Sequence, residues 1–486
     1  MYITSVVEKN QHNNEIYDNQ NSTNYNNVIY SYIKEYEYKY LTFQFTTPQI
    51  EAILNIVNIK ETKKDIAIIG KAGTGKTSLI KCAIYILRKL GLNVITCATT
   101  GKAAVEIDGQ TVHSLFSFPM GVISPHKTLN PRYEDVIQKT DIIIIDEISM
   151  LRFDLFEAAI NYLEMIELQN NLFSNSNIKR PRLVVCGDFA QLPPVINNTD
   201  APYYKKFYGD NIHPFQSKYW KENFKEIRLN AVMRQSDSIW INALNSIRNR
   251  ANLSDALSII NSRVINGNRM PDNTTILSGR KVEVANYNKQ MFDQLDARTE
   301  YFTAEIAGNV TQKDLKDLNI EEHLTLKIGA KVLITRNNPE AGYYNGTMGT
   351  YIGKSQSGDL RVETNNGEIV LVNQATWEKT EYQTVTKYRE DSKNPEKIIS
   401  YESLESVTIG TTKQYPIILG YAITIHKSQG MTLDSVIVDS SRGSFFSAGM
   451  AYVALSRVKS IDGLYLTKAL TPFDIKVDQA VIDGGF

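Results

Sequence analysis

One eight-residue segment constrains the fold of this chain more than any other. Residues 70–77 read GKAGTGKT and match the pattern G-x-x-x-x-G-K-[ST]. The segment follows an apolar run at 66–69 and precedes residues 78–87, whose composition and spacing are helical. A strand, a glycine-rich turn and a helix in this order form a phosphate-binding loop, because backbone N–H groups and the helix N-terminus face the anion. We therefore expect an α/β domain with a nucleotide site at this turn.

The loop offers both side-chain and backbone contacts. Lys76 should reach the β- and γ-phosphates, and the Thr77 hydroxyl should ligate Mg²⁺. Glycine allows other N–H groups to approach the phosphates closely. The remaining candidates for nucleotide contact in the loop are Gly70, Ala72, Gly73, Thr74, Gly75 and Ser78.

A second apolar run ends in two carboxylates. Residues 141–147 read DIIIIDE, which predicts a buried strand. Asp146 would hold Mg²⁺, and Glu147 would polarise the attacking water. The same two acids could instead cap a helix and occupy its first turn. The phosphate loop upstream favours the catalytic interpretation.

Composition excludes several classes of protein. At 486 residues the chain exceeds one ordinary domain. It has no run of 18 apolar residues, and no arginine precedes Arg88, so we expect neither a membrane span nor a mitochondrial transit peptide. The three cysteines (Cys82, Cys97 and Cys186) lack metal-ligand spacing and indicate a reducing compartment. We expect a cytoplasmic protein, with a nuclear or viral context left open.

The net charge is zero, from 53 basic and 53 acidic residues. Such a chain does not coat nucleic acid through bulk charge. Any strand that it binds must lie in a locally polar and basic groove.

Composition and the pattern of apolar and turn residues divide the chain into four parts. Residues 1–40 are expected to form an arm that is asparagine-rich at 10–27, followed by a short strand in which Tyr36, Tyr38 and Tyr40 alternate with charged residues. Ordered α/β structure should begin near Phe43. The expected units are a first α/β domain at 41–225, a second at 226–326 and 413–486, and a β-rich insertion at 327–412. Turn signals such as Asn345-Gly346 make the insertion a small antiparallel barrel, or alternatively a surface meander.

Three further segments follow in order: GDFAQLPP at 187–194, TIHKSQG at 424–430 and YVALSR at 452–457. Together with the phosphate loop at 70–77 and the acidic segment at 141–147, these three segments resemble the motifs of the superfamily 1 DNA helicases of the 5′→3′ (B) branch. The resemblance is closest to the Dda, RecD and Pif-type helicases. The resemblance implies two RecA-like domains, each a parallel sheet flanked by helices, with ATP between them. It also implies a small wedge inserted in the first domain and an SH3-like barrel in the second. The Pro-Phe-Gly-Gly run usual before the third motif of Pif-type helicases is missing, which leaves Dda-like and RecD-like membership equally open.

The resemblance also assigns roles at the nucleotide. Gln49 would read adenine, since an amide pairs with both a donor and an acceptor. Gln191 would sense the γ-phosphate, and Arg234 and Arg457 would reach across the cleft to the charge that develops on the phosphoryl group. Gln429 and Gly430 would lie near the nucleotide.

Other segments would contact DNA. By position, the first domain supplies the strand contacts Thr99, Thr100, Gly101, Lys102, Thr111, His113, Ser114 and Pro193. The second domain supplies Thr424, His426, Lys427 and Ser428. Residues 115–132 would form the pin that parts the duplex, with Phe116, Phe118, Pro119 and Met120 as candidates to stack on the splitting base pair; an apolar loop packed on its own domain is the alternative.

The expected activity is ATP-dependent 5′→3′ translocation on single-stranded DNA with unwinding of duplex. ATP and Mg²⁺ are the expected cofactors. Single-stranded DNA and its junctions with duplex are the expected partners, together with replication or recombination proteins, and the chain is expected to be a monomer. Two alternatives stay open: a translocase that remodels protein–DNA complexes without separating strands, and a nucleotide-gated DNA-binding subunit of a recombination or nuclease complex.

Overall fold

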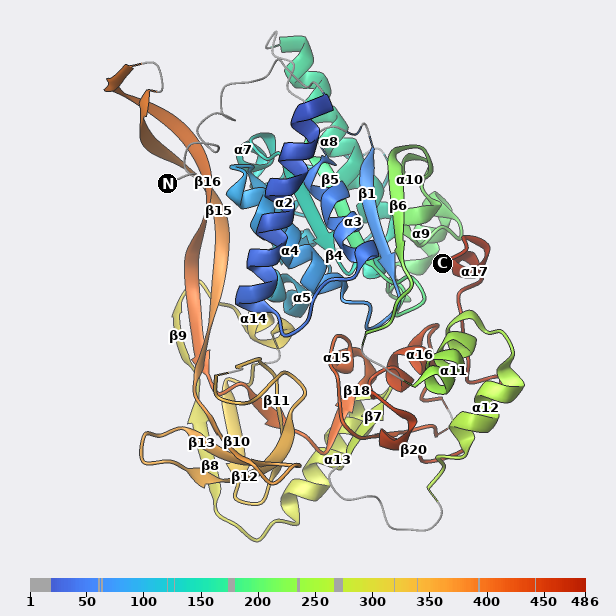
Figure 1. Cartoon of the computed structure of the whole chain (residues 1–486). Helices are drawn as coiled ribbons and strands as arrows, with labels where there is room; N and C mark the ends of the chain where they lie inside the picture. The colour runs from blue at the N-terminus through green and yellow to red at the C-terminus, as the bar shows by residue number, and fades with distance from the viewer. Residues whose placement is uncertain are drawn as a thin grey trace.

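Two bodies built on parallel sheets lie one above the other, with a β-rich region beside them (Figure 1). The computed structural model describes residues 19–59, 62, 64–119, 121–125, 127–173, 180–233, 237–265, 274–318, 320–338, 340–391, 394–441 and 443–486. We call the upper body the first lobe and the lower body the second lobe.

The first lobe is organised by a six-stranded sheet in the order β3-β2-β4-β5-β1-β6. Every neighbouring pair of strands is parallel. The strands are β1 (Asp65–Gly70), β2 (Val94–Ala98), β3 (Gln110–Thr111), β4 (Ile142–Asp146), β5 (Arg182–Gly187) and β6 (Phe224–Leu229). The carboxyl ends of β1 and β4 therefore lie at one edge, which is where an open parallel sheet binds its ligand.

Both faces of this sheet are covered by helices, and β1 shows why. Ile66 and Ile68 contribute to the core beneath α2 (Asn19–Tyr40), α3 (Thr47–Val57) and α4 (Lys76–Lys89). Ala67 and Ile69 contribute to the opposite core, beneath α7 (Glu134–Gln138), α8 (Phe153–Phe173) and α10 (Lys218–Asn223). Alternate side chains of a strand point to opposite faces, so a continuous apolar run becomes buried on both.

The expected arm and short strand at the N-terminus are wrong for the described residues. Residues 19–40 form helix α2, on which Ile29, Ile33 and Tyr36 are buried at helical spacing. The alternation of tyrosines was misleading, because Tyr38 is 92% and Tyr40 59% exposed. Ordered structure thus begins well before Phe43. Residues 1–18 lie outside the described part.

The second lobe has a four-stranded sheet in the order β18-β7-β19-β20, again parallel throughout. Its strands are β7 (Thr275–Ser278), β18 (Ala422–Thr424), β19 (Val436–Val438) and β20 (Leu464–Leu466). Helices α11 (Ser238–Asn249), α12 (Leu253–Asn261) and α16 (Met450–Leu455) share its main core, and α13 (Lys281–Asp293) packs on the other face.

A β-rich region lies between β7 and β18 in the sequence. A five-stranded antiparallel sheet, in the order β14-β13-β12-β11-β17, shares one core with the pair β8–β10. The strands are β8 (Thr299–Thr303), β10 (His323–Lys327), β11 (Lys331–Ile334), β12 (Met348–Lys354), β13 (Leu360–Thr364), β14 (Ile369–Val372) and β17 (Ile417–Leu419). The antiparallel character agrees with the expected insertion, and its SH3-like closure stays a prediction.

A long hairpin extends from this region along the first lobe (Figure 1). Strand β15 (Ala375–Asp391) pairs with β16 (Asn394–Gln414), which also pairs with β9 (Glu305–Gly308), and β15 contacts α7 of the first lobe. A small barrel or a surface meander was expected over residues 327–412, so these long strands are a correction.

Three domain boundaries also differ from the expectation. The β-rich region ends at Leu419, past the expected residue 412, because β17 pairs with β11. Strand β6 pairs with β1 along its whole length, so the first lobe continues past residue 225 to Leu229. The β-rich region begins at β8, ahead of the expected residue 327, because β8 pairs with β10. The remaining short elements are α5 (Gly101–Glu106), α6 (Val112–Leu115), η2 (Ile148–Met150), α9 (Ala201–Tyr208), η3 (Pro214–Gln216), α14 (Gln312–Asp317), α15 (Ile425–Ser428), η4 (Ile461–Gly463) and α17 (Gln479–Asp483).

The C-terminal segment returns from the second lobe to the first. Val481 of α17 belongs to the first-lobe core, and Asp478 lies 2.8 Å from the buried ring nitrogen Nε2 of His213. Among the described helices, none is both long and apolar enough to span a membrane.

Candidate nucleotide and strand-binding site

The phosphate loop joins β1 to α4 in the way that its sequence predicts. Gly73 and Gly75 adopt positive φ angles of 79° and 76°, the left-handed region that favours glycine. A Cβ at Gly70 would lie 2.7 Å from the Thr74 hydroxyl, so the turn has no room for a side chain there. The Lys76 ammonium donates to the carbonyl oxygens of Gly70 (2.7 Å) and Lys71 (3.0 Å), which places it inside the loop. Thr77 and Ser78 follow in the first turn of α4.

Gln49 is buried behind this loop. Its Nε2 donates to the Thr74 carbonyl at 2.9 Å, while its Oε1 accepts from the backbone N–H of Thr46 at 2.8 Å. The pattern T-x-x-Q is a capping box, which the sequence already contained. Gln49 thus ties the start of α3 to the loop, and its contact with adenine stays a prediction.

The two carboxylates lie at the end of β4, where they were expected. Asp146 is buried and Glu147 is partly exposed, and desolvation raises the pKa of each carboxyl above its ordinary value. The Glu147 N–H donates to Oδ1 of Asp146 at 2.8 Å, and Glu147 has φ 54°, a strained angle for a residue with a side chain. Such strain is typical of functional sites and fixes the direction of the Glu147 side chain.

The second lobe contacts this carboxylate directly. Gln429 donates from Nε2 to Oε2 of Glu147 at 3.3 Å, and its place near the nucleotide stays a prediction. Gly430 follows with φ 77°. The backbone carbonyl of Gln429 accepts from the Lys102 ammonium at 3.1 Å.

Lys102 therefore does not lie where the sequence placed it. It was expected on the DNA backbone, but its ammonium bridges the lobes at the nucleotide cleft. Burial lowers its pKa to about 8, against the opposing effect of Glu106. The helix that carries it begins at Thr100, whose hydroxyl accepts from Ala103 N–H, and this cap directs Gly101 and Lys102 toward the second lobe.

Arg457 lies in the second lobe beside the cleft, but its guanidinium turns back into its own lobe. It donates to the carbonyls of Val453 (2.7 Å), Ser428 (3.2 Å) and Met431 (3.3 Å). In this structure two of these bonds hold it against the 428–431 turn of its own lobe. Arg234 lies outside the described residues; the preceding Met233 donates its N–H to the Gly73 carbonyl at 2.8 Å.

Sequence reasoning missed a buried ion pair at the same interface. Arg248 of α11 donates to Oδ1 of Asp188 at 2.8 Å, and Gln191 donates to Oδ2 of the same carboxylate at 3.3 Å. Burial opposes ionisation of Asp188, but Arg248 and Lys76 outweigh it and keep its pKa below the usual range. Asp188 lies in the GDFAQLPP segment, whereas nothing local marks Arg248. Pro193 follows, partly exposed.

The two lobes carry matching short helices at the positions where strand contacts were expected. Thr111 caps α6 by accepting from Ser114 N–H, and Thr424 caps α15 by accepting from Lys427 N–H, both at 3.2 Å. Each cap leaves an exposed histidine in the first turn: His113 in the first lobe and His426 in the second. Partial desolvation of the rings, aided by nearby cations, lowers the pKa of both imidazoles, which favours their neutral form.

Each histidine also lies against a phenylalanine ring. His113 meets Phe118 edge-on, with centroids 5.5 Å apart, and His426 stacks with Phe446 at 6.4 Å. Phe446 is exposed and was not among the expected residues. Thr99 and Ser428 are less available, because their hydroxyls donate to the carbonyls of Glu147 and Ile425.

The expected pin is mostly core. Phe116 is fully buried, and Phe118 stacks on it with ring centroids 5.5 Å apart. A ring packed in this core cannot stack on a base pair, so Phe116 is withdrawn as a pin residue. Pro119 is partly exposed, and Met120 lies outside the described residues. The wedge role of residues 115–132 stays a prediction.

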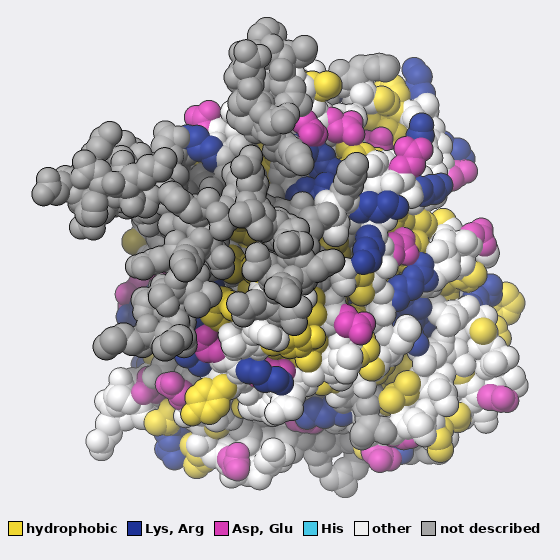
Figure 2. Space-filling view, turned by 45° about the horizontal axis from the view of Figure 1, so that its top comes forward, with side chains coloured by type: hydrophobic (Ala, Val, Ile, Leu, Met, Phe, Trp, Pro, Cys, Tyr) yellow, Lys and Arg dark blue, Asp and Glu magenta, His cyan; other side chains and the backbone are white. Residues whose placement is uncertain are grey.

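Surface charge agrees with the balanced composition. On the face in Figure 2, basic and acidic side chains are interspersed over the described residues. Within the described ranges, no three His, Cys, Asp or Glu side chains converge as in a metal site built from protein alone. Thr77 and Asp146 offer oxygen ligands, which suit Mg²⁺ shared with substrate phosphates.

Comparison with known proteins agrees with this architecture. The family model described as PIF1-like helicase matches residues 44–266, and a second model, described as Helicase, matches residues 392–478. The ATP-dependent DNA helicase Pif1 of Campylobacter jejuni is 30% identical over 447 residues, which cover 85% of this chain and 92% of that protein.

Solved structures extend the likeness to three dimensions. Pif1 from a Bacteroides species in complex with ADP-AlF4 is 29% identical, covers 91% of this chain and 96% of its own, and gives a TM-score of 0.74. The same helicase bound to single-stranded DNA gives 0.59. These matches resolve the choice that the missing Pro-Phe-Gly-Gly run had left open. The chain belongs to the Pif1-like family of ATP-dependent DNA helicases, within superfamily 1B.

Proposed function

We propose that this chain moves 5′→3′ along single-stranded DNA and separates duplex ahead of it, using ATP bound between the two lobes. One observation carries the proposal: residues of the second lobe contact the hydrolytic residues of the first. Gln429 bonds to Glu147, so displacement of one lobe must disturb the other lobe's catalytic carboxylate.

The roles at the nucleotide follow from this arrangement. Lys76 and the loop N–H groups bind the phosphates, and Glu147 accepts the proton of the attacking water. Thr77 and Asp146 would hold Mg²⁺, which offsets negative charge on the phosphates when bound. Arg457 can act on the transferred phosphoryl group only after it exchanges its carbonyl partners, which a closing lobe would require.

The strand would cross both lobes at their capped helices. His113 and His426 are neutral, exposed and backed by aromatic rings, which suits contacts that tolerate any base sequence. Lys427 adds a cation in the second lobe, and Pro193 borders the groove near Gln191. Junctions of single-stranded and duplex DNA are the proposed substrate, with the chain acting as a monomer alongside replication or recombination proteins.

Duplexes with only a 5′ or only a 3′ tail test the direction. Unwinding of the 5′-tailed duplex alone is expected, and unwinding confined to the 3′-tailed duplex would reject the proposal. Lys76→Ala should abolish DNA-stimulated ATP hydrolysis, since the ammonium that neutralises the phosphates is gone. Persistent hydrolysis by this variant would reject the site.

A further inference from the structure

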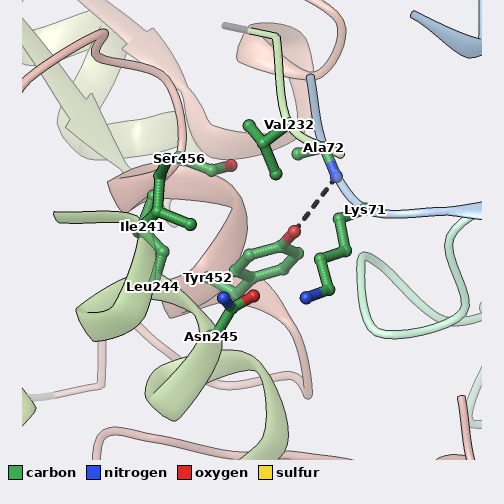
Figure 3. A pocket seen from close by; sticks show the side chains of 8 residues that line it. All are labelled: Lys71, Ala72, Val232, Ile241, Leu244, Asn245, Tyr452 and Ser456. Atoms are coloured by element: carbon green, nitrogen blue, oxygen red, sulfur yellow. Dashed lines mark hydrogen bonds between the residues drawn. The ribbon is translucent and has the colours of Figure 1, made fainter. Parts of the chain in front are cut away.

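Tyr452 places a side chain of the second lobe inside the nucleotide site of the first. It lies on α16, and its hydroxyl accepts from the Ala72 N–H of the phosphate loop at 3.1 Å. Figure 3 shows the ring pointing from its helix toward Ala72, with Lys71 and Asn245 beside it. The same hydroxyl lies 3.3 Å from Oδ2 of Asp188.

The direction of these hydrogen bonds is fixed by chemistry. A backbone N–H can only donate, so the hydroxyl must accept from Ala72. The hydroxyl proton is then free for Asp188, which is ionised because Arg248 pairs with it at 2.8 Å. Each member of the network thus has one arrangement, running from Ala72 through Tyr452 to Asp188 and Arg248.

The network is buried, and this makes it sensitive to lobe position. Asp188 is fully buried, and Arg248 and Tyr452 are nearly so. A buried carboxylate that loses its cation, or a buried N–H that loses its acceptor, is costly. Two of the four groups belong to each lobe, so separation of the lobes breaks both the Ala72–Tyr452 hydrogen bond and the Arg248–Asp188 ion pair.

The same helix also contacts the Gln191 segment. The backbone of Gly449, at the start of α16, approaches so closely that a Cβ there would lie 2.1 Å from the Gln191 carbonyl oxygen. Gln191 itself donates to Asp188. One short helix therefore contacts both the phosphate loop and the segment that leads to the strand groove.

We propose that Tyr452 is a positioning residue that couples the phosphate loop to the Asp188–Gln191 segment, so that nucleotide-driven lobe movement reaches the DNA groove. The proposal rests on the helicase function proposed above and deepens it. The hydroxyl keeps the phosphate loop and the Asp188–Gln191 segment in a fixed relative position, and it takes no part in bond cleavage.

Tyr452→Phe tests this by removing one oxygen while keeping the ring. Two quantities are measured: ATP hydrolysed per base pair unwound, and the ratio of single-stranded DNA Kd values with and without a non-hydrolysable ATP analogue. We expect the first to rise, and the ratio to move toward one, by about two- to twelvefold, the range for one buried hydrogen bond. The matched control is Tyr204→Phe, which also loses a buried hydroxyl, bonded to the Asn211 carbonyl within the first lobe.

Asp188→Asn is the second variant and serves if Phe at position 452 prevents folding. It should change both quantities in the same direction, and the double variant should show no more effect than the larger single change, because both act through one network. The inference is overturned if Tyr452→Phe lowers the ATPase and unwinding rates by the same factor. In that case the ATP hydrolysed per base pair and the ratio of DNA Kd values would stay as in the wild type, and the role of Tyr452 would be structural only. A wild-type chain that hydrolyses ATP without unwinding 5′-tailed duplex would instead overturn the proposed function.

Discussion

Lys102 is a single residue whose charged side chain links the two lobes. The sequence placed it on DNA, yet its ammonium bonds to the Gln429 carbonyl. Burial holds its pKa near 8, well below the value of about 10.4 for lysine in an unfolded chain. A cation kept in this cleft can balance the phosphates of the nucleotide and the Glu147 carboxylate.

The pKa of Lys102 predicts a pH-dependent stability. Between pH 8 and about 10, the unfolded chain binds a proton that the folded chain has released, so this group makes unfolding harder as pH rises. Lys102→Met removes the effect. The free energy of unfolding of the wild type, minus that of the variant, should therefore increase from pH 7 to pH 10 in urea titrations. A constant difference would contradict the burial of this charge; Lys218→Met, at a side chain 86% exposed, is the control.

Gly449 carries a close approach between the lobes. Gly449→Ala would place a side chain at a positive φ of 73° and against the Gln191 carbonyl oxygen. Gly91→Ala would place one at a similar φ of 76°, with open space around it. The control should cost about 1–2 kcal/mol from backbone strain alone. Gly449→Ala should cost more and should also reduce DNA-stimulated ATPase, measured by steady-state kinetics. Equal stability losses with normal ATPase would show that the contact with Gln191 is unimportant.

Sequence motifs predicted correctly those site residues whose position depends only on their neighbours in the chain. The loop glycines and the two carboxylates lie where their motifs require. The partners across the cleft could not be found in this way: Ala72 and Tyr452 are separated by 380 positions, and Arg248 lies in an ordinary amphipathic helix. Arg457 was found by its motif, but its orientation depends on carbonyls of a distant turn.

At the scale of elements, α2 shows how a periodic pattern can mislead. Three tyrosines in alternation suggested a strand, while Ile29, Ile33 and Tyr36 formed the stripe that decided the structure. The long hairpin β15–β16 was not expected. Residues 375–391 contain no turn signal, and the structure forms them into one continuous strand.

The α2 helix can be tested by comparing its two faces. Ile33→Ala should lower the free energy of unfolding by about 2–5 kcal/mol, because it leaves a cavity in the first-lobe core. Tyr38→Ala, on the exposed face, should change it by less than about 0.5 kcal/mol. Chemical denaturation measures both. Similar small effects would mean that residues 19–40 behave as an arm after all.

The two lobes meet at several places, and two of these connections differ in their relation to the nucleotide. One connection is the nucleotide site, where Gln429, Tyr452 and Arg248 meet the first lobe. The other is the C-terminal segment, where His213 pairs with Asp478 and the Phe486 ring packs 4.5 Å from that of Phe215. The second connection does not involve nucleotide residues, so it can hold the lobes together while the first opens and closes.

Lobe movement driven by ATP is the central claim, and a distance between the lobes tests it directly. All three native cysteines are buried, so dyes can be attached selectively to Tyr38→Cys on the first lobe and Phe473→Cys on the second, positions that are 92% and 86% exposed. With single-stranded DNA present, a non-hydrolysable ATP analogue should shift the energy-transfer efficiency, and Lys76→Ala should abolish the shift. An efficiency that is the same with and without the analogue in the wild type would contradict the account.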